Sequence, residues 1–437
     1  MNILVVGGGG REHALAWKLA GEAGGSRVLC APGNAGIATV ARLAEVGAAD
    51  PEALASLAER EHIDLTVVGP EIPLDRGIAD LFFSRGLRIF GPSRAAAQLE
   101  CSKVFAKAFM ARHGIPTARY RVCDRADEAR DVIRSGELGL PIVIKADGLA
   151  AGKGVVVAPT RDQANAAVSA AMEQRQFGEA GARVVLEECL AGPEVSFFAL
   201  CDGTRATPLM TAQDHKRVFD NDEGPNTGGM GAFAPSPLAD AALEARVMRE
   251  IVDPVVAGLH EEGHEYRGFL YAGLMLTCDG PKVIEFNVRF GDPEAQVVIP
   301  MVADPLAPWL VAAAEGSLPP GRPAFTPERH VGVVLASRGY PGSGPTGLPI
   351  SGLDEAARLD DVLVFHAGTA RRDGEIVTAG GRVLTVVGRG ASYEQAIARA
   401  YDGVSRIHFE GMHFRRDIGL KALHAQLPTP NAQLPIH

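Results

Sequence analysis

Residues 3–13 read Ile3-Leu4-Val5-Val6-Gly7-Gly8-Gly9-Gly10-Arg11-Glu12-His13, an apolar run that passes through four glycines into a polar segment. Such a run predicts a buried strand, a tight glycine turn and the start of a helix. Outward from it, short apolar runs alternate with helical stretches, at residues 12–20, 28–31, 51–60 and 65–68. This alternation is typical of βαβ units, so we predict a parallel α/β domain over the first hundred residues or so.

The four glycines favour a phosphate site over a dinucleotide site. The dinucleotide fingerprint G-x-G-x-x-G needs a third glycine, but Glu12 or His13 stands there, depending on the starting glycine. A dehydrogenase is therefore disfavoured. A strand, a glycine turn and a helix N-terminus still direct backbone N–H groups and the helix dipole at an anion, and we expect a phosphate monoester.

The rest of the chain divides into a central and a C-terminal block, which makes the whole a multidomain α/β and α+β protein. The central block, residues 102–320, opens with a helix capped by Ser102. Its strands are predicted at residues 142–145, 155–158, 184–188, 196–201, 271–277 and 283–290. A third block, residues 321–426, begins with a linker and has strands at residues 330–337, 362–367 and 382–387 and a helix at residues 393–407. The proline-containing tail, residues 427–437, is typical of disorder.

A second glycine-rich loop, Lys145 to Gly154, predicts a flap over a nucleotide. It is one residue shorter than a P-loop, and it leads into an apolar run of strand type instead of a helix. The loop would therefore join two antiparallel strands and bring Lys145 and Lys153 to the phosphates. A flexible hairpin with solvated lysines is the alternative, disfavoured because neither lysine fits an apolar strand without a partner.

An alternating strand at residues 283–290 predicts a cation site. One face would carry Ile284, Phe286, Val288 and Phe290, and the other Glu285, Asn287 and Arg289. A carboxylate and an amide oxygen two residues apart suit a hard cation that takes its other ligands from phosphates and water. An amphipathic strand with a wet face is the commoner reading of such a pattern alone, but Asp292 and Glu294 place two more acids nearby.

Two further polar segments carry functional hypotheses. Residues 213–217 precede the glycine-rich residues 224–231, and a polar loop of this length is usually functional or disordered. In residues 187–194 a strand ends in an acidic loop. That loop would offer backbone groups to adenine and a carboxylate to ribose hydroxyls, although on its own it would be taken for a solvated loop.

Composition excludes several classes of protein. The 437 residues are 46% hydrophobic and 22% charged, with a net charge of −10, which excludes disorder as the main state. No Lys/Arg-rich block is present, so nucleic acid is not an expected partner. The six cysteines form no C-x-x-C pair and indicate reduced thiols. We find no signal peptide or membrane span in the sequence, and we expect a cytoplasmic monomer or weak homo-oligomer.

The chain closely resembles the phosphoribosylamine–glycine ligases of the ATP-grasp superfamily. The matching segments are Gly8–Leu15, Pro32–Gly36, Lys145–Gly154, Gln213–Arg217, Gly224–Gly231, Glu285–Glu294, His366–Thr369 and Arg415–Gly419. The resemblance implies an N-terminal substrate-binding domain over residues 1–101, an ATP-grasp domain over residues 102–320 with a mobile lid at about 121–192, and a small C-terminal domain. It also implies that ATP drives the ligation of glycine to 5-phosphoribosylamine in de novo purine biosynthesis, giving glycinamide ribonucleotide, ADP and phosphate.

The resemblance further implies roles for individual residues. ATP would be bound by Lys103, Lys145, Lys153, Glu187, Leu190 and Glu194. Mg²⁺ or Mn²⁺ would be held by Glu285 and Asn287. The other substrates would be bound by Gly9, Gly10, Asn34, Asp214, Arg289, Asp292 and Glu294. Catalysis would involve Lys153, Asp214, Lys216, Arg289 and Asp292.

The chain departs from the family at a few positions, and two alternatives stay open. Cys101 replaces the usual glycine and Val288 a frequent cysteine. Residues 271–277 contain no acid where many ATP-grasp enzymes have a third metal ligand, so the number of metal ions is not determined. The alternatives are another ATP-grasp ligase or carboxylase of purine metabolism and a non-catalytic nucleotide-binding protein. The second is disfavoured because both lysines and both metal ligands are present.

Overall fold

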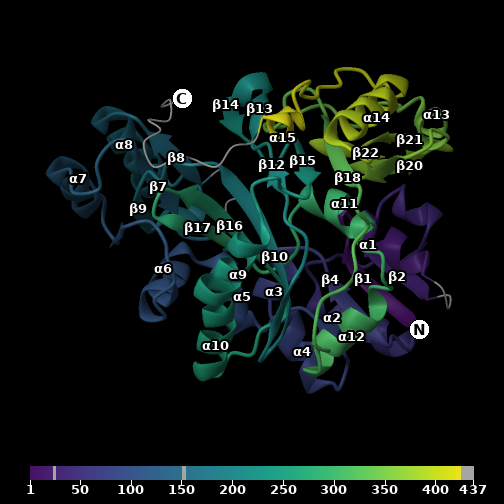
Figure 1. Ribbon diagram of the computed structural model, residues 1–437, viewed down its shortest axis with the longest axis horizontal. Helices are drawn as coiled ribbons and strands as arrows, with labels where there is room; N and C mark the ends of the chain where they lie inside the picture. The colour runs from purple at the N-terminus through teal and green to yellow at the C-terminus, as the bar shows by residue number, and fades with distance from the viewer. Residues whose placement is uncertain (23–25, 150–153, 425–437) are drawn as a thin grey trace.

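The computed structural model describes residues 1–22, 26–149 and 154–424. Its first strand lies at the centre of a parallel five-stranded sheet in the order β3-β2-β1-β4-β5, which confirms the predicted N-terminal fold (Figure 1). Leu4 and Val6 pack with helix α2 on one face, and Ile3 and Val5 pack with helix α1 on the other. The strands are β1 (Asn2–Gly7), β2 (Arg27–Pro32), β3 (Arg42–Leu43), β4 (Leu65–Val68) and β5 (Ile89–Phe90), and the helices are α1 (Gly10–Ala20), α2 (Pro51–Arg60), α3 (Glu71–Asp75), α4 (Ile78–Ser84) and α5 (Arg94–Cys101).

The central part contains two antiparallel sheets. The smaller sheet, in the order β6-β9-β7-β8, belongs to the segment at the left of Figure 1, and residues 121–192 are called the lid below. Its elements are β6 (Tyr120–Cys123), α7 (Ala126–Ser135), β7 (Ile142–Ala146), β8 (Val155–Ala158), α8 (Arg161–Val168) and β9 (Val184–Glu188). The larger sheet has the order β11-β10-β16-β17, and its elements are β10 (Glu194–Asp202), β11 (Ala206–Pro208), β16 (Arg267–Thr277) and β17 (Gly280–Asn287). Helices α6 (Lys103–Arg112), α9 (Ala241–Val247), α10 (Asp253–Glu261), α11 (Glu294–Val298) and α12 (Ala307–Glu315) complete this part.

The C-terminal sheet takes strands from two distant parts of the chain. Its order is β12-β15-β18-β22-β19, so β12 (Gln213–Asp214) and β15 (Gly231–Ala234) pair into a sheet whose other strands follow residue 328. Between them, β13 (Arg217–Phe219) and β14 (Glu223–Asn226) form a separate hairpin. The remaining elements are β18 (Arg329–Ala336), α13 (Leu353–Ala357), β19 (Val362–His366), β20 (Thr369–Arg372), β21 (Glu375–Thr378), β22 (Arg382–Gly390), α14 (Tyr393–Arg406) and α15 (Leu420–Leu423).

Strand β17 differs from its prediction in two ways. It ends at Asn287 instead of Phe290, because the Val288 N–H donates to Glu100 at 2.7 Å and not to a neighbouring strand. The register also shifts between Gly273 and Leu274 of β16, which face Glu285 and Val283. At this bulge Ile284 lines the same cavity as Glu285 and Asn287, whereas Phe286 packs in the hydrophobic core, so the prediction that Ile284 shares a face with Phe286 was wrong.

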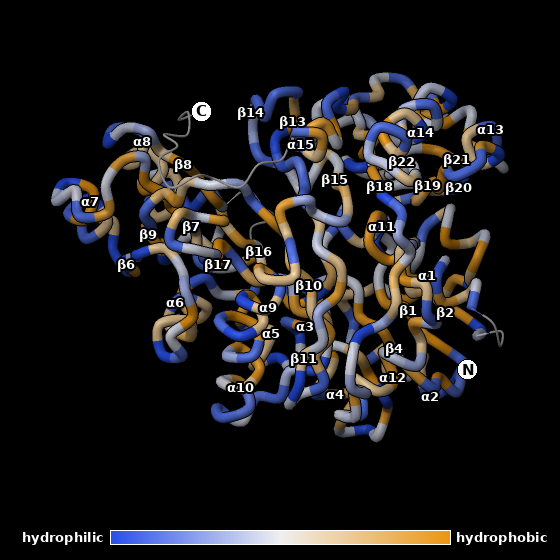
Figure 2. Tube along the Cα trace, in the orientation of Figure 1, coloured by the Kyte–Doolittle hydropathy of each residue, from blue (hydrophilic) through white to orange (hydrophobic). Residues whose placement is uncertain are grey.

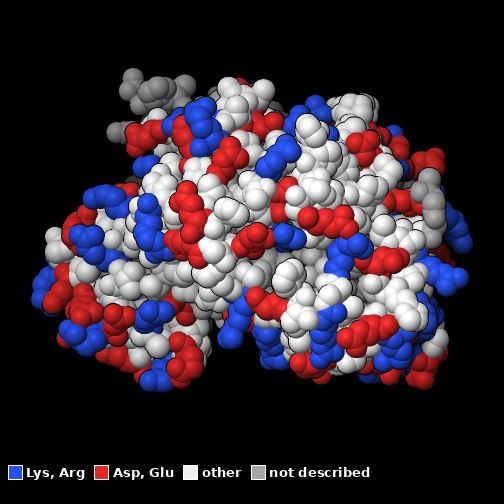
Figure 3. Space-filling model, turned by 90° about the horizontal axis from the view of Figure 1, so that it is seen from below, with Lys and Arg blue, Asp and Glu red and all other residues white. Residues whose placement is uncertain are grey.

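The distribution of hydropathy and charge agrees with this layered fold. Apolar segments in Figure 2 run along the central strands and the inward sides of the helices. Basic and acidic side chains are interspersed on the face seen in Figure 3. None of the described helices combines the length and the apolar character needed to cross a bilayer. All six cysteines are free thiols. The predicted disorder of the tail concerns residues outside the described part of the chain.

Candidate active site

A cavity of about 740 Å³ lies where the three parts of the molecule meet. Its position at the carboxyl ends of β1 and β4 is the usual place for a ligand in an open parallel sheet. Its lining includes Arg11 and Glu71 from the N-terminal part, Lys145, Leu149 and Leu190 from the lid, Glu285 and Asn287 from β17, and Tyr340 and Arg382 from the C-terminal part.

The lid side of the cavity is organised by a buried carboxylate between two lysines. Glu187 on β9 lies 3.0 Å from the Nζ of Lys145 on β7 and 2.8 Å from the Nζ of Lys107 on α6. Lys145 also donates to the carbonyl oxygen of Ile284 at 2.9 Å. Burial lowers the pKa of Lys107 to about 8, against the opposing effect of Glu187. The three charges hold the two central strands of the lid sheet, β7 and β9, and helix α6 together.

The glycine-rich loop is tied to the N-terminus of α6. The predicted cap at Ser102 is confirmed, since its Oγ accepts the Phe105 N–H at 3.0 Å. The same hydroxyl donates to Asp147 of the loop at 2.8 Å, and Asp147 accepts the Val104 N–H at 3.1 Å. The loop and the cavity-lining Lys103 are thereby fixed to one another. Lys153 lies outside the described residues.

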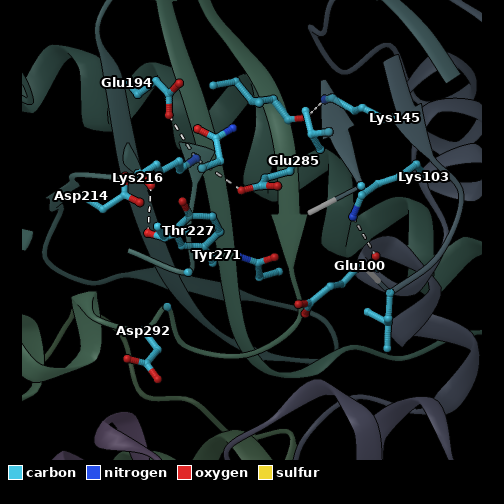
Figure 4. A pocket seen from close by; sticks show the side chains of 18 of the residues that line it. Glu100, Lys103, Lys145, Glu194, Asp214, Lys216, Thr227, Tyr271, Glu285 and Asp292 are labelled. Carbon is cyan, nitrogen blue, oxygen red and sulfur yellow. Dashed lines mark hydrogen bonds and ion pairs between the residues drawn. The ribbon is translucent and has the colours of Figure 1, made fainter. Parts of the chain in front are cut away.

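Lys216 lies at the centre of a group of carboxylates opposite the lid (Figure 4). Its Nζ is 3.1 Å from Glu194 and 3.5 Å from Glu285. Burial opposes the charge on Lys216, but Glu194, Asp214 and Glu285 outweigh it, and the Lys216 pKa lies well above its ordinary value. Lys216 is therefore a permanent positive charge within this group.

Glu285 and Asn287 present oxygen atoms that suit a hard cation. Burial disfavours the ionised form of Glu285, but Lys216, Lys103 and Lys145 outweigh it and lower the Glu285 pKa to about 2. The acceptors around the Asn287 amide assign its nitrogen to the side of Glu100: with the amide turned this way, the nitrogen donates to Glu100 at 3.2 Å and to the Phe286 carbonyl at 3.1 Å, which leaves the amide oxygen for a ligand. The described residues contain no group of three His, Cys, Asp or Glu side chains arranged for a metal. A pair of oxygen ligands completed by phosphates and water fits this donor set.

Asp214 has a raised affinity for protons. Burial raises its pKa to about 7, helped by Glu294, Glu194 and Glu285 and opposed by Lys216. Burial also raises the pKa of Glu294, even though Ser196 donates to this carboxyl at 3.0 Å. Two acids with raised pKa values therefore lie beside a permanent cation at this end of the cavity.

Arg289 and Asp292 are held by residues far away in the sequence. Arg289 lies 2.7 Å from Glu100 and 3.3 Å from Glu71. Asp292 lies 3.2 Å from the guanidinium of Arg382, and Arg382 also donates to the Asp292 carbonyl at 2.7 Å. Burial opposes ionisation of Asp292, but Arg382, Arg11 and Arg289 lower its pKa. Asp292 is therefore ionised and carries a negative charge into the cavity.

Three predicted substrate residues do not line the cavity, namely Gly9, Gly10 and Asn34. The Asn34 side chain donates to the carbonyls of Gly8 at 2.9 Å and His366 at 2.8 Å, and it accepts the N–H groups of Gly36 and Ile37. It therefore joins the first glycine turn to the C-terminal part. A Cβ placed on Gly9 would lie 3.6 Å from the Asp292 carboxylate, so this turn adjoins the cavity at Asp292.

Several residues of the site were missed from the sequence, among them Glu71, Glu100, Lys107, Tyr340 and Arg382. A lysine four residues after Lys103 in an apolar helix was an available signal for Lys107, because a buried lysine needs a partner. Arg382 is 90 residues from Asp292 and carried no local signal.

The fold is that of the ATP-grasp class. Fold neighbours include the Campylobacter jejuni biotin carboxylase solved with β-γ-ATP (TM-score 0.73, 16% identity, 97% of this chain and 95% of that one). Another is the N5-carboxyaminoimidazole ribonucleotide synthetase of Thermotoga maritima (TM-score 0.63, 19% identity, 93% and 99%). Residues 101–295 match the ATP-grasp (A) domain of phosphoribosylglycinamide synthetase, and residues 1–100 and 330–421 match its N and C domains.

The chain belongs to the phosphoribosylglycinamide synthetase family, as its motifs predicted. It is 53% identical to the phosphoribosylamine–glycine ligase of Xylella fastidiosa, over 97% of this chain and 98% of the relative. It is 51% identical to that of Ralstonia nicotianae, over 97% and 100%. A solved phosphoribosylamine–glycine ligase of Thermotoga maritima has a TM-score of 0.81 at 34% identity, and the match covers 95% of this chain and 100% of that one.

Proposed function

We propose that this chain ligates glycine to 5-phosphoribosylamine with ATP, giving glycinamide ribonucleotide, ADP and phosphate in purine biosynthesis. The observation that carries the proposal is the position of Lys216 between Glu194 and Glu285, in the cavity that the lid lysine Lys145 also lines. One cavity thus contains a cation for a carboxylate substrate and an oxygen pair for a metal. We place the reaction in the cytoplasm, because the six free cysteines of this chain would stay reduced there.

The first step activates the carboxylate of glycine, which is a poor electrophile at neutral pH. One carboxylate oxygen attacks the γ-phosphorus of ATP, the bond from that phosphorus to the β–γ bridging oxygen breaks, and ADP leaves. Lys103, Lys145 and Lys153 neutralise the phosphates, while Glu187, Leu190 and Glu194 hold the nucleoside. Glu285 and Asn287 would hold Mg²⁺ or Mn²⁺, which when bound supplies positive charge for the transferring phosphoryl group.

The second step forms the amide. The amine nitrogen of phosphoribosylamine attacks the acyl carbon of glycyl phosphate, the carbon–oxygen bond to phosphate breaks, and the nitrogen loses a proton. Asp214, with a pKa of about 7, is suited to accept this proton at its carboxylate. Arg289, Asp292 and Glu294 orient the two substrates, and the closed lid keeps water from the acyl phosphate. The phosphate end of phosphoribosylamine would be bound by Gly9, Gly10 and Asn34.

A coupled assay tests the proposal. Purified protein is supplied with ATP, glycine and freshly made phosphoribosylamine, and each component is omitted in turn. We expect one ADP for each amide formed and no product when any component is missing. Release of AMP would exclude the acyl-phosphate route. Full activity with another amino acid and none with glycine would reassign the substrate.

A further inference from the structure

The C-terminal motif Arg415–Gly419 has no part in the proposed reaction, yet it contacts the segment that carries Lys216. The Arg415 side chain is 0% exposed. Its guanidinium donates to the carbonyl oxygen of Arg217 at 3.0 Å, to Asp222 at 2.9 Å, and to both oxygens of Asp417 at 2.8 and 2.6 Å. A buried arginine with so many partners fixes the relative position of all of them.

The tip of the β13–β14 hairpin depends on these contacts. Asn221 and Asp222 have φ angles of 60° and 56°, in the left-handed region that side-chain-bearing residues rarely adopt. Such a conformation persists where the surroundings over-determine it. Here the Asn221 N–H donates to Asp417 at 2.9 Å, and Lys421 lies 2.6 Å from Asp222. The C-terminal segment therefore supplies partners that hold the tip in place.

The other end of the same hairpin forms part of the cavity. The carbonyl oxygen of Lys216 accepts the Thr227 N–H at 2.8 Å and the Thr227 hydroxyl at 2.9 Å. At the end of β14, the cavity is lined by Asn226, Thr227 and Gly228. At the start of β13, Lys216 extends to Glu194 and Glu285. The Arg415 guanidinium donates to the carbonyl oxygen of Arg217, the residue next to Lys216.

We propose that Arg415 is a positioning residue for the reaction. Through the Arg217 carbonyl and Asp222 it holds the β13–β14 hairpin, and so keeps the Lys216 ammonium between Glu194 and Glu285. The inference rests on the proposed function of Lys216 in the cavity. The buried Arg415 would then support catalysis without contacting any substrate.

Kinetics of three variants test the proposal. Arg415→Met should lower kcat at least tenfold and leave KM for ATP within twofold, because Lys145 and Glu187 belong to the lid and keep their contacts. Arg415→Lys should recover part of the loss. The matched control is Arg416→Met, the adjacent exposed arginine, which should behave like the parent. A parent-like kcat for Arg415→Met, or an equal loss of kcat in Arg416→Met, would overturn the proposal.

A second variant and a second measurement guard against misfolding. Asp222→Asn keeps a residue that tolerates positive φ and removes only the charge at a partly exposed position, so it should fold and show the same kcat loss in weaker form. Hydrogen exchange of residues 213–228 should accelerate in Arg415→Met and Asp222→Asn, while exchange of the lid stays at the parent rate. Unchanged exchange in the hairpin would overturn the inference whether or not the parent ligates glycine. Absence of ligation by the parent, in contrast, would count against the proposed function.

Discussion

Replacing Lys216 by methionine should tighten the binding of a divalent cation in the absence of nucleotide, while removing ligation. The Lys216 Nζ lies 3.5 Å from the Glu285 carboxylate, where we expect the cation. Lys216 therefore competes for this carboxylate and repels any cation bound to it. Methionine keeps an unbranched side chain of nearly the same length and removes the charge and the N–H donors of the ammonium group.

The size of the effect follows from this distance. A hard cation lies about 2.1 Å from its ligand oxygen, so it would be no more than about 5.6 Å from the Lys216 Nζ. At that separation the repulsion between a double and a single positive charge is about 1.5 kcal/mol, even with water-like screening. Removing it corresponds to roughly tenfold tighter binding.

Calorimetric titration of nucleotide-free protein with Mn²⁺ measures the effect. At pH 8 the parent carboxyls of Glu285 and Asp214 are mainly ionised, since their pKa values are about 2 and about 7. We expect a Kd about tenfold lower in Lys216→Met, no binding when Glu285→Gln is added, and no ADP release in the coupled assay. An unchanged or higher Kd would refute the reasoning, because the cation would then not bind beside Lys216.

Three further predictions concern single residues. Glu285→Ala should abolish ligation without lowering the unfolding temperature appreciably, because the side chain faces the cavity; ligation at the parent rate would exclude the metal assignment. Asp214→Asn should gain stability relative to the parent between pH 5 and pH 8, by at most about 3 kcal/mol, because a carboxyl whose pKa is raised by folding loses stability as the pH rises through about 7. Urea unfolding at both pH values measures this, and a constant difference would contradict it. Lys107→Met should raise KM for ATP roughly tenfold with little change in KM for glycine, because Glu187 loses a partner at 2.8 Å; equal changes in both constants would count against this role.

Local elements could be predicted because their causes are local. Ser102 caps helix α6 by accepting the N–H of Phe105, three residues further on, as the sequence indicated, and Ser392 caps α14 in the same way. The glycine-rich loop after Lys145 joins antiparallel strands, as its apolar continuation predicted. Strand β17 was predicted less well at its ends, because Val288 pairs with a carboxylate 188 residues away.

The sequence alone determined which chemical groups the site contains: Glu285 and Asn287 two residues apart, the lysines of the lid loop, and the Asp214–Lys216 pair. Only the tertiary structure decided which charges face one another. Glu187 forms ion pairs with both Lys107 and Lys145, and Asp292 forms one with Arg382. Arg415 donates a hydrogen bond to the β13–β14 hairpin. The physical reason is that periodicity and capping act over a few residues, whereas ion pairing and burial depend on distances in space that arise when separate parts of the chain pack together.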